Sequence, residues 1–150
     1  MSASPERPEL DRLRDTLTGA QRFEVGPLDV EDACRRYAEA GYEVTPRLRE
    51  FLENYGELTV TWMFRQWEVE LTTSVEQALD MPVRSARIYA KRIGEPVLPV
   101  GVTSSTEDWV LLAENGDILI AGDAGVQRVA NGFAPSLQAL ITGDWDMTFF

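Results

Sequence analysis

The chain has 150 residues, of which 44% are hydrophobic and 26% are charged, a composition typical of one soluble globular domain. Its 25 acidic and 14 basic residues give a formal net charge of -11 at neutral pH. This charge argues against nucleic acid and anionic membranes as partners and favours a basic protein. Because the sequence has no histidine, catalytic triads and metal sites that use imidazole are excluded.

The first 25 residues are predicted to be an N-terminal extension with one short helix. Residues 8–17 place Leu10, Leu13 and Leu17 at helical spacing, and Gly19 follows as a stop. The charged start has no apolar stretch that would serve as an export signal or a membrane span. We therefore expect a cytoplasmic protein whose single folded domain spans residues 26–150.

Two capped helices are predicted next. Asp29 is the N-cap of a helix that ends at Gly41. Thr45 and Pro46 then supply an N-cap and a first-turn proline for a second helix, which ends at Gly56.

Strict alternation of apolar and polar residues predicts a β-hairpin formed by residues 58–64 and 66–71. One face is apolar and includes Trp67. The other face is expected to be wet and flat, and we call it the acidic face; it presents Thr59, Thr61, Glu68 and Glu70.

After this hairpin, residues 74–79 are predicted to form a helical turn and residues 82–93 a helix. The outer side of that helix carries a basic stripe of Arg84, Arg87 and Lys91. Three cations in so acidic a chain are more often solvated, or paired with the protein's own acids, than bound to phosphate. Nucleic acid is therefore the weaker interpretation of this stripe.

Residues 97–102 are predicted to be extended, but Pro99 removes one hydrogen-bond donor and favours a sheet edge or a bulge. A short strand is predicted at residues 126–130 and a closing helix at residues 135–142. The final residues, 144–150, are expected to dock on the body of the protein.

A second hairpin is predicted from residues 109–113 and 118–122. Its Asn115–Gly116 pair suits a two-residue type I′ turn, in which both central residues have positive φ, and this turn sets Leu111 opposite Ile120. Both faces of the hairpin are apolar. We therefore expect its strands to lie in the middle of the sheet with both faces covered.

Three features suggest chemistry, and each has a simpler explanation. Cys34 lies on the apolar side of a predicted helix, where a thiol is packed and inert. Glu68 and Glu70 are about 6 to 7 Å apart along their strand, a separation that suits an inverting glycosidase, but a solvated strand face explains the pair without further assumption. The turn at residues 122–125 lacks further oxygen ligands at the spacing of a calcium loop. The sequence therefore predicts no catalytic residue, no cofactor and no metal site.

A series of short motifs is more specific in its order and spacing than any one motif is alone. The series is Ala40-Gly41-Tyr42 leading into Pro46, Phe51-Leu52, Tyr55-Gly56-Glu57-Leu58, Tyr89-Ala90, Arg92-Ile93-Gly94, Val97-Leu98-Pro99-Val100-Gly101, the hairpin 112–120 about Gly116, Ser136-Leu137, Ala139-Leu140 and Gly143. In these motifs the chain resembles the SUKH superfamily of bacterial immunity proteins, in the branch encoded beside deaminase-like toxins. The resemblance covers about residues 28 to 143.

The resemblance implies an α+β fold in a single domain, with an antiparallel sheet flanked by several helices. It also implies a cytoplasmic protein, not an enzyme, that binds and neutralises a cognate toxin domain. The alternative, from another class, is a cytoplasmic domain that binds a small ligand or catalyses a reaction. A gene for a large secreted toxin directly upstream would favour the first function, and a metabolic operon would favour the second.

We predict that the toxin binds the acidic face, with Glu68 and Glu70 at its centre. The polar segment formed by Glu107, Asp108 and Trp109 is a candidate flank of the same surface. A basic toxin domain would fit because opposite charges steer the encounter of two proteins. The oligomeric state stays open.

Overall fold

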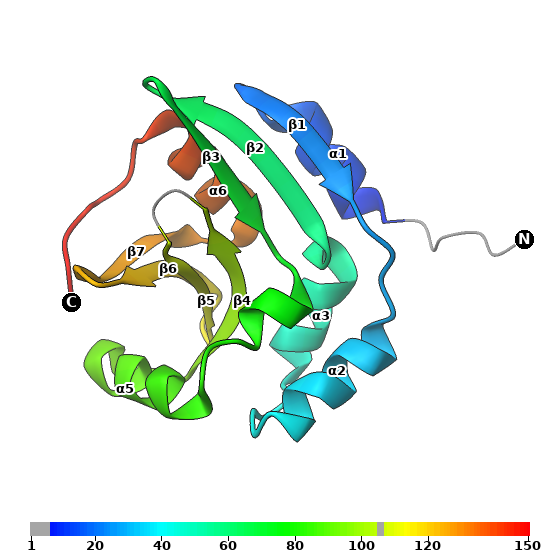
Figure 1. The fold of residues 1–150 in the computed structure, drawn as a ribbon, viewed down its shortest axis with the longest axis vertical. Helices are drawn as coiled ribbons and strands as arrows, with labels where there is room; N and C mark the ends of the chain where they lie inside the picture. The colour runs from blue at the N-terminus through cyan, green and yellow to red at the C-terminus, as the bar shows by residue number, and fades with distance from the viewer. Residues whose placement is uncertain (1–6, 105–106) are drawn as a thin grey trace, which may run out of the picture.

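Seven strands form one antiparallel sheet in the computed structural model, which describes residues 7–104 and 107–150 (Figure 1). Each strand pairs with the next one along the chain. The strands are β1 (Ala20–Val25), β2 (Leu58–Phe64), β3 (Trp67–Thr72), β4 (Val97–Thr103), β5 (Trp109–Ala113), β6 (Asp117–Gly122) and β7 (Gly125–Asn131).

Six helices in these described ranges flank the sheet or connect its strands. They are α1 (Pro8–Thr16), α2 (Val30–Glu39), α3 (Pro46–Tyr55), α4 (Val75–Ala78), α5 (Val83–Ile93) and α6 (Phe133–Thr142). α2 and α3 link β1 to β2, α4 and α5 link β3 to β4, and α6 follows β7. The architecture confirms the α+β fold, the antiparallel sheet and the flanking helices that the sequence predicts.

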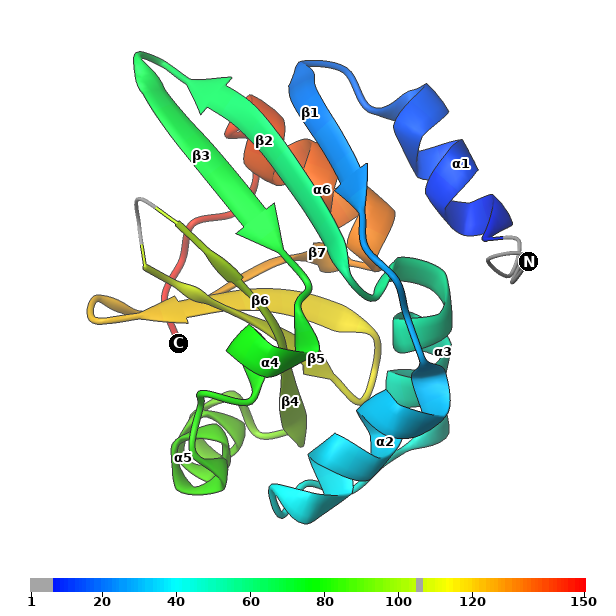
Figure 2. The same ribbon diagram turned by 45° about the vertical axis from the view of Figure 1, so that its right-hand side comes forward.

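The sheet curves around α6. This helix contacts β2 near one end of the sheet and β6 and β7 at the other end (Figure 2). Leu137 of α6 is fully buried, as are Leu58 and Val60 of β2 and Ile118 of β6. The helix therefore lies inside the curve of the sheet, and the alternate residues of β2 that face it form part of the core.

The helix caps read from the sequence are present. The Asp29 carboxylate accepts a hydrogen bond from the backbone N of Asp32 at 3.1 Å, and the Thr45 hydroxyl accepts one from the backbone N of Leu48 at 3.1 Å. Gly94 follows α5 in the left-handed region at φ 86°, where glycine has no steric penalty. These local signals set the helix ends correctly.

Residues 7–16 pack onto the rest of the chain. Leu10 and Leu13 of α1 are buried, and α1 contacts α3. The Arg7 guanidinium donates to the carbonyl of Gly56 at 2.7 Å, at the C-terminal end of α3. A cation at this end of a helix satisfies a free carbonyl and interacts favourably with the helix dipole.

β1 is an edge strand that the sequence analysis does not predict. It pairs with β2, and a bulge interrupts the pairing between Ala20 and Arg22. The bulge places the apolar residues Ala20, Phe23 and Val25 out of strict alternation. The usual strand pattern is therefore absent from the sequence although the strand is present.

Pro99 does not make β4 an edge strand, because β4 lies between β3 and β5. The pairing with β5 shifts between Pro99 and Gly101. Of the two outcomes predicted from Pro99, a sheet edge or a bulge, the bulge is therefore confirmed. Glycine is required at position 101 because a Cβ there would collide with the carbonyl oxygen of Thr72.

The β5–β6 hairpin is central and covered on both faces, as predicted, but the predicted register is wrong by one residue. Leu111 pairs with Leu119 and not with Ile120. The loop is therefore residues 114–116, in which only Gly116 has a positive φ, at 94°. A three-residue loop that ends in a glycine bulge replaces the predicted type I′ turn.

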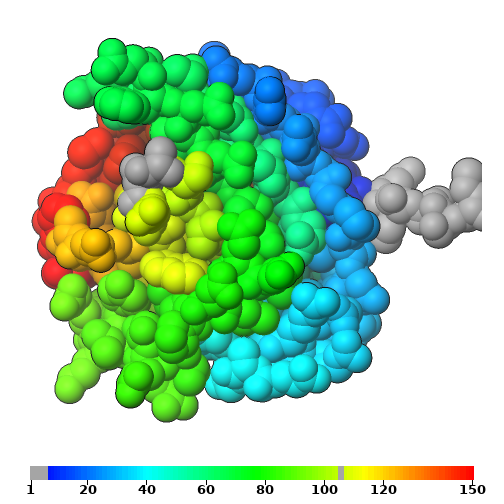
Figure 3. Space-filling view, viewed as in Figure 1, coloured from blue at the N-terminus to red at the C-terminus, as the bar shows by residue number. Residues whose placement is uncertain are grey.

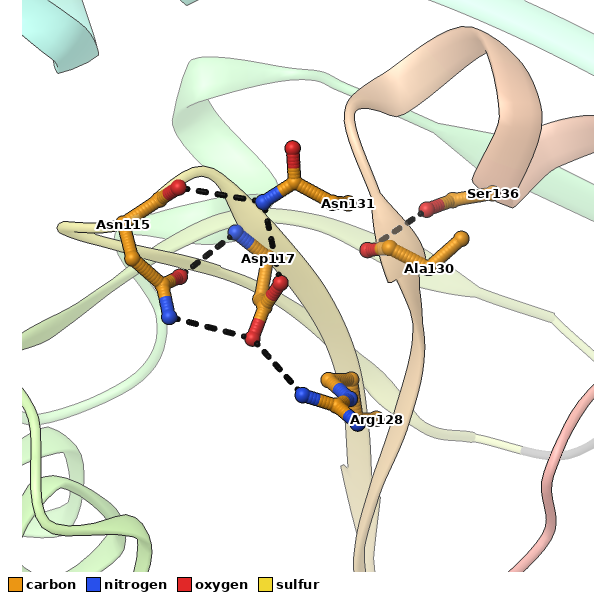
Figure 4. Close-up of polar contacts among 6 residues, drawn as sticks. All are labelled: Asn115, Asp117, Arg128, Ala130, Asn131 and Ser136. Carbon is orange, nitrogen blue, oxygen red and sulfur yellow. Dashed lines mark hydrogen bonds and ion pairs between the residues drawn. The ribbon is translucent and has the colours of Figure 1, made fainter.

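Polar side chains of β7 hold the 114–116 loop in its three-residue conformation (Figure 4). The Asn131 side-chain amide donates to the Asn115 carbonyl and to the Asp117 carboxylate, both at 3.0 Å. The backbone N of Asp117 donates to the Asn115 side chain at 2.8 Å, and Arg128 Nη1 lies 3.5 Å from the Asp117 carboxylate. The turn is thus fixed by side chains of a third strand, which the rules for two-stranded hairpins do not include.

The C-terminal tail docks along β7, as expected. The backbone N of Phe150 donates to the carbonyl of Val126 at 2.9 Å, and Phe149 forms an isolated bridge with Gln127. Trp145 packs against the core. The side chains of Phe149 and Phe150 nevertheless remain about half exposed.

Candidate partner-binding surface

The strand pairing brings the residues of the acidic face to one side of the sheet. Thr61 lies opposite Glu70, and Met63 lies opposite Glu68. Residues directly opposite each other in an antiparallel pair share a face, and Thr59 joins them by alternation along β2. Both carboxylates are exposed.

The two threonines of this face do not contribute equally to its surface. Thr61 is only 4% exposed, so the prediction that it presents its side chain is wrong. Thr61 lies on β2 between Arg22 and Glu70 on the neighbouring strands. Thr59 is half-buried, and its hydroxyl bonds to that of Thr72 at 3.1 Å. The threonines support the face, and the glutamates form its outer surface.

Two charged residues of β1 extend this side of the sheet. Arg22 lies opposite Thr61, and Glu24 lies opposite Thr59, and both are exposed. Sequence reasoning missed them because it did not predict β1. The only available signal was the apolar set of residues 20, 23 and 25, which becomes a strand pattern once the bulge is allowed.

The predicted flank lies beside Glu70. A groove of about 280 Å³ between β3 and the segment that enters β5 is lined by Glu70, Ser104, Glu107 and Trp109, among others. Ser104 joins the two sides, since the backbone N of Glu70 donates to its hydroxyl at 3.2 Å and its own backbone N donates to the Glu70 carbonyl at 2.7 Å. In the space-filling view β3 and the start of β5 lie on the same face of the molecule (Figure 3).

Asp108 holds this segment in place. The backbone N of Thr103 donates to the Asp108 carbonyl at 2.8 Å, and the backbone N of Asp108 donates to the Thr103 hydroxyl at 3.3 Å. The Asp108 carboxylate lies against Gly122, where a Cβ would collide with it. Glu107 is exposed, with a φ of 53°. Of these two acids, Glu107 therefore faces solvent more freely.

Four exposed acids and one cation belong to the acidic face, its predicted flank and β1. Within residues 7–104 and 107–150, none of the four acids forms an ion pair. The acids are Glu24, Glu68, Glu70 and Glu107, and the cation is Arg22. Four negative charges against one positive charge leave this surface with a net negative field, which would steer a cationic partner.

The basic stripe of α5 lies far from the acidic face. Arg84, Arg87 and Lys91 are exposed, as predicted. The helix lies at the opposite end of the molecule from the β2–β3 turn (Figure 1). The basic stripe and the acidic face are therefore separate surfaces of the molecule.

The candidate nucleophile Cys34 is buried. Arg49 Nη1 lies 3.7 Å from its sulfur, and burial raises the pKa of the thiol. A thiol with a raised pKa forms little of the reactive thiolate at neutral pH, in line with the predicted packed thiol. Among the described residues, no three cysteine, aspartate or glutamate side chains are placed to hold one metal ion.

None of the helices in the part of the chain that the structure describes is long and apolar enough to cross a bilayer. Together, the fold and this surface define an α+β domain that presents unpaired carboxylates from a strand face and an adjoining segment.

A family model described as SUKH-3 immunity protein matches residues 26–143. The chain therefore belongs to the SUKH-3 immunity protein family, which confirms the superfamily that the sequence motifs indicate. Comparison with curated proteins and with solved structures gave no match.

Proposed function

We propose that this chain is a cytoplasmic, non-catalytic immunity protein that binds a cognate toxin domain and neutralises it. The observation that carries the proposal is the family match over residues 26–143. We further propose that the toxin belongs to the deaminase-like polymorphic toxins, the group with which the sequence motifs are associated. Neither nucleic acid nor membrane is part of this function, in keeping with the net charge of -11.

The proposed contact surface is the acidic face with its flank. Glu68, Glu70 and Glu107 supply exposed carboxylates without ion-pair partners among the described residues. The backbone of a hydrogen-bonded strand is already ordered, so a partner that binds this face pays little additional cost for ordering the backbone. A basic toxin domain is the partner that this surface favours.

The test is a charge reversal on the acidic face. Glu68→Lys with Glu70→Lys should leave the melting temperature nearly unchanged, because both side chains are exposed. The double variant should weaken binding to the toxin domain encoded beside this chain's gene, since like charges across an interface cost several kcal/mol. The loss should shrink at high salt, where screening acts over about 8 Å or less.

The matched control reverses charge on the basic stripe. Arg84→Glu with Arg87→Glu changes as many charges on an exposed helix and should bind and protect cells like the wild type. If the control abolishes neutralisation while the acidic-face variant protects fully, the toxin binds the helical side and the proposed surface is wrong. If the wild-type protein binds no neighbouring toxin, the proposed function itself fails.

One cavity favours the alternative function, the binding of a small ligand. It has a volume of about 280 Å³, and its lining includes apolar and aromatic side chains together with two cations and two acids. They include Tyr42, Val83, Leu112, Arg47, Arg87, Glu43 and Glu114. An apolar floor with a few charged groups is the usual make-up of a ligand site. A thermal-shift screen against aliphatic and aromatic carboxylic acids tests it: a shift that Arg87→Ala removes would support this alternative, and no shift with any acid would reject it.

A further inference from the structure

The tip of the β2–β3 hairpin, residues 63–68, carries exposed apolar surface. Trp67 is 63% exposed and Met63 is 40% exposed, although the sequence pattern predicts Trp67 on the buried face. Within the described residues β3 pairs with β4 only through Leu71 and Thr72. The tip therefore extends past the neighbouring strand, at the end of the molecule (Figure 2), and Trp67 has little around it to cover its ring.

The tip contacts the end of α6 through Phe64. Phe64 pairs with Trp67 across a loop of two residues, and the Phe64 ring fills the space beside Gly143, where a Cβ would come within 2.7 Å of it. The Arg65 guanidinium lies 5.5 Å from the centroid of the same ring, a cation–π contact. Phe64 thus anchors the tip to the end of α6. Its pairing partner Trp67 is on the same hairpin and remains exposed.

The exposed tryptophan and the acids lie on opposite sides of the tip. Trp67 and Glu68 are consecutive in β3, so their side chains point to opposite faces. Glu70 shares the side of Glu68. A flat partner can contact only one of these sides, whereas a partner that contacts both has to enclose the tip.

We propose that the hairpin tip inserts into a cleft of the toxin domain. Trp67 enters an apolar pocket on one wall of the cleft, and Glu68 and Glu70 meet cations on the other wall. This proposal rests on the proposed function and adds to it the shape of the partner, a concave basic surface, and the residue that anchors the complex.

The choice of a basic, concave partner follows from charge and from the side chain involved. Glu68 and Glu70 form no ion pair within the described part of the chain, so their field is available to cations. Tryptophan is the residue type most enriched among energetic hot spots of interfaces, because its large ring buries much apolar area at a small entropic cost. On a rigid hairpin that cost is smaller still.

The first experiment removes the anchor. Trp67→Ala should weaken binding to the neighbouring toxin domain by about 30-fold or more, the size of a hot-spot effect, and Trp67→Phe should lose less. The loss should persist at high salt because it is apolar, unlike the loss caused by Glu68→Lys. Ile88→Ala, which removes an apolar side chain of α5 that is 57% exposed, is the matched control and should bind like the wild type.

The second experiment blocks insertion itself. Gln66→Cys places a thiol at the exposed turn, and the native Cys34 is buried, so a maleimide-linked polyethylene glycol chain will attach at the tip. The labelled Gln66→Cys protein should fail to bind the toxin domain. The same label on Arg92→Cys, at an exposed position of α5, should leave binding intact.

The outcomes separate this proposal from the proposed function. If the wild type binds, Glu68→Lys weakens binding, and both Trp67→Ala and the labelled tip bind normally, the toxin docks flat on the acidic face and insertion is wrong. If Trp67→Ala and Ile88→Ala lose affinity equally, Trp67 is not the anchor. If the wild type does not bind the toxin domain at all, the proposed function is wrong, and the insertion proposal, which rests on it, is wrong as well.

Discussion

The two hairpins of the sheet are built from similar lengths of chain but have opposite surroundings. In β5–β6 both faces are apolar and covered, and Leu111 and Leu119 are almost completely buried. In β2–β3 the strand β2 contacts α6, while one face of β3 presents Glu68 and Glu70 to solvent. Both hairpins lie between other strands. The contrast arises because β5–β6 is covered on both faces, whereas the tip of β2–β3 extends beyond its pairing with β4.

This contrast indicates which hairpin contributes mainly to stability and which is available to bind a partner. A hairpin buried on both faces contributes mainly to the core, although Trp109, at the start of β5, also lines the groove beside Glu70. A hairpin that extends from the sheet contributes less to the core, and its exposed side chains are available for binding. We therefore expect substitutions in β5–β6 to change folding and substitutions at the β2–β3 tip to change binding.

The largest expected effect is in the buried hairpin. Leu111→Ala should lower the free energy of unfolding by about 2 to 5 kcal/mol, because it removes apolar contacts and leaves a cavity. Glu114→Ala, in the exposed loop of the same hairpin, and Glu70→Ala, on the exposed face of β3, should each change it by less than about 0.5 kcal/mol. Urea unfolding measures all three, and similar small losses for Leu111→Ala and Glu70→Ala would remove the contrast between the hairpins.

The turns of the two hairpins offer a finer comparison. Gly116 has φ 94°, and Arg65, in the β2–β3 turn, has φ 58°. Gly116→Ala should cost about 1 to 2 kcal/mol, because an L side chain is strained in the left-handed region. Arg65→Gly relieves the same strain but adds entropy to the unfolded chain, so it should change stability by less than about 0.5 kcal/mol. A larger loss for Arg65→Gly than for Gly116→Ala, measured by thermal unfolding, would contradict this account.

A smaller loss than that of Leu111→Ala is expected at Tyr42, which is buried. The Tyr42 hydroxyl donates to the carbonyl of Met81 at 2.7 Å, and burial raises the pKa of Tyr42 to about 12. Tyr42→Phe should cost about 1 kcal/mol at neutral pH through the lost hydrogen bond.

The same tyrosine makes a prediction about alkaline pH. An unfolded tyrosine loses its proton near pH 10, so above that pH the unfolded state binds fewer protons than the native state. Stability should therefore fall from about pH 10 towards the folded pKa, and it should fall less steeply in Tyr42→Phe. Urea midpoints from about pH 9 to about pH 11 give both slopes, and equal slopes would show that Tyr42 is not protected from ionisation.

Local signals account for most of the elements that the sequence predicts correctly. Asp29, Thr45 and Gly94 set helix ends because a cap depends on a few neighbouring backbone groups. Strict alternation identifies β2 and β3 because most of their apolar residues are buried on one face, while Met63, Glu68 and Glu70 on the other face are exposed. The apolar character of both faces of β5 likewise predicts its central place.

The candidate site could be predicted only in part. Glu68 and Glu70 follow from alternation along one strand, but the burial of Thr61 depends on the neighbours that β1 and β3 place beside it. The groove that joins Glu70 to Glu107 depends on the pairing of β3 with β4. Contacts between segments distant in the chain leave no local pattern.

The sequence by itself determined the helix ends, the alternating hairpin, the apolar centre of the sheet and the family motifs, because each depends on residues close together in the chain. Tertiary structure alone decided the register of β5–β6, which Asn131 of β7 helps to set, and the presence of β1, whose bulge hides its alternation. It also decided the exposure of Trp67. The sequence pattern assigns this side chain to the buried face, but β4 does not reach far enough to cover it, and the extent of a neighbouring strand is a property of the whole sheet.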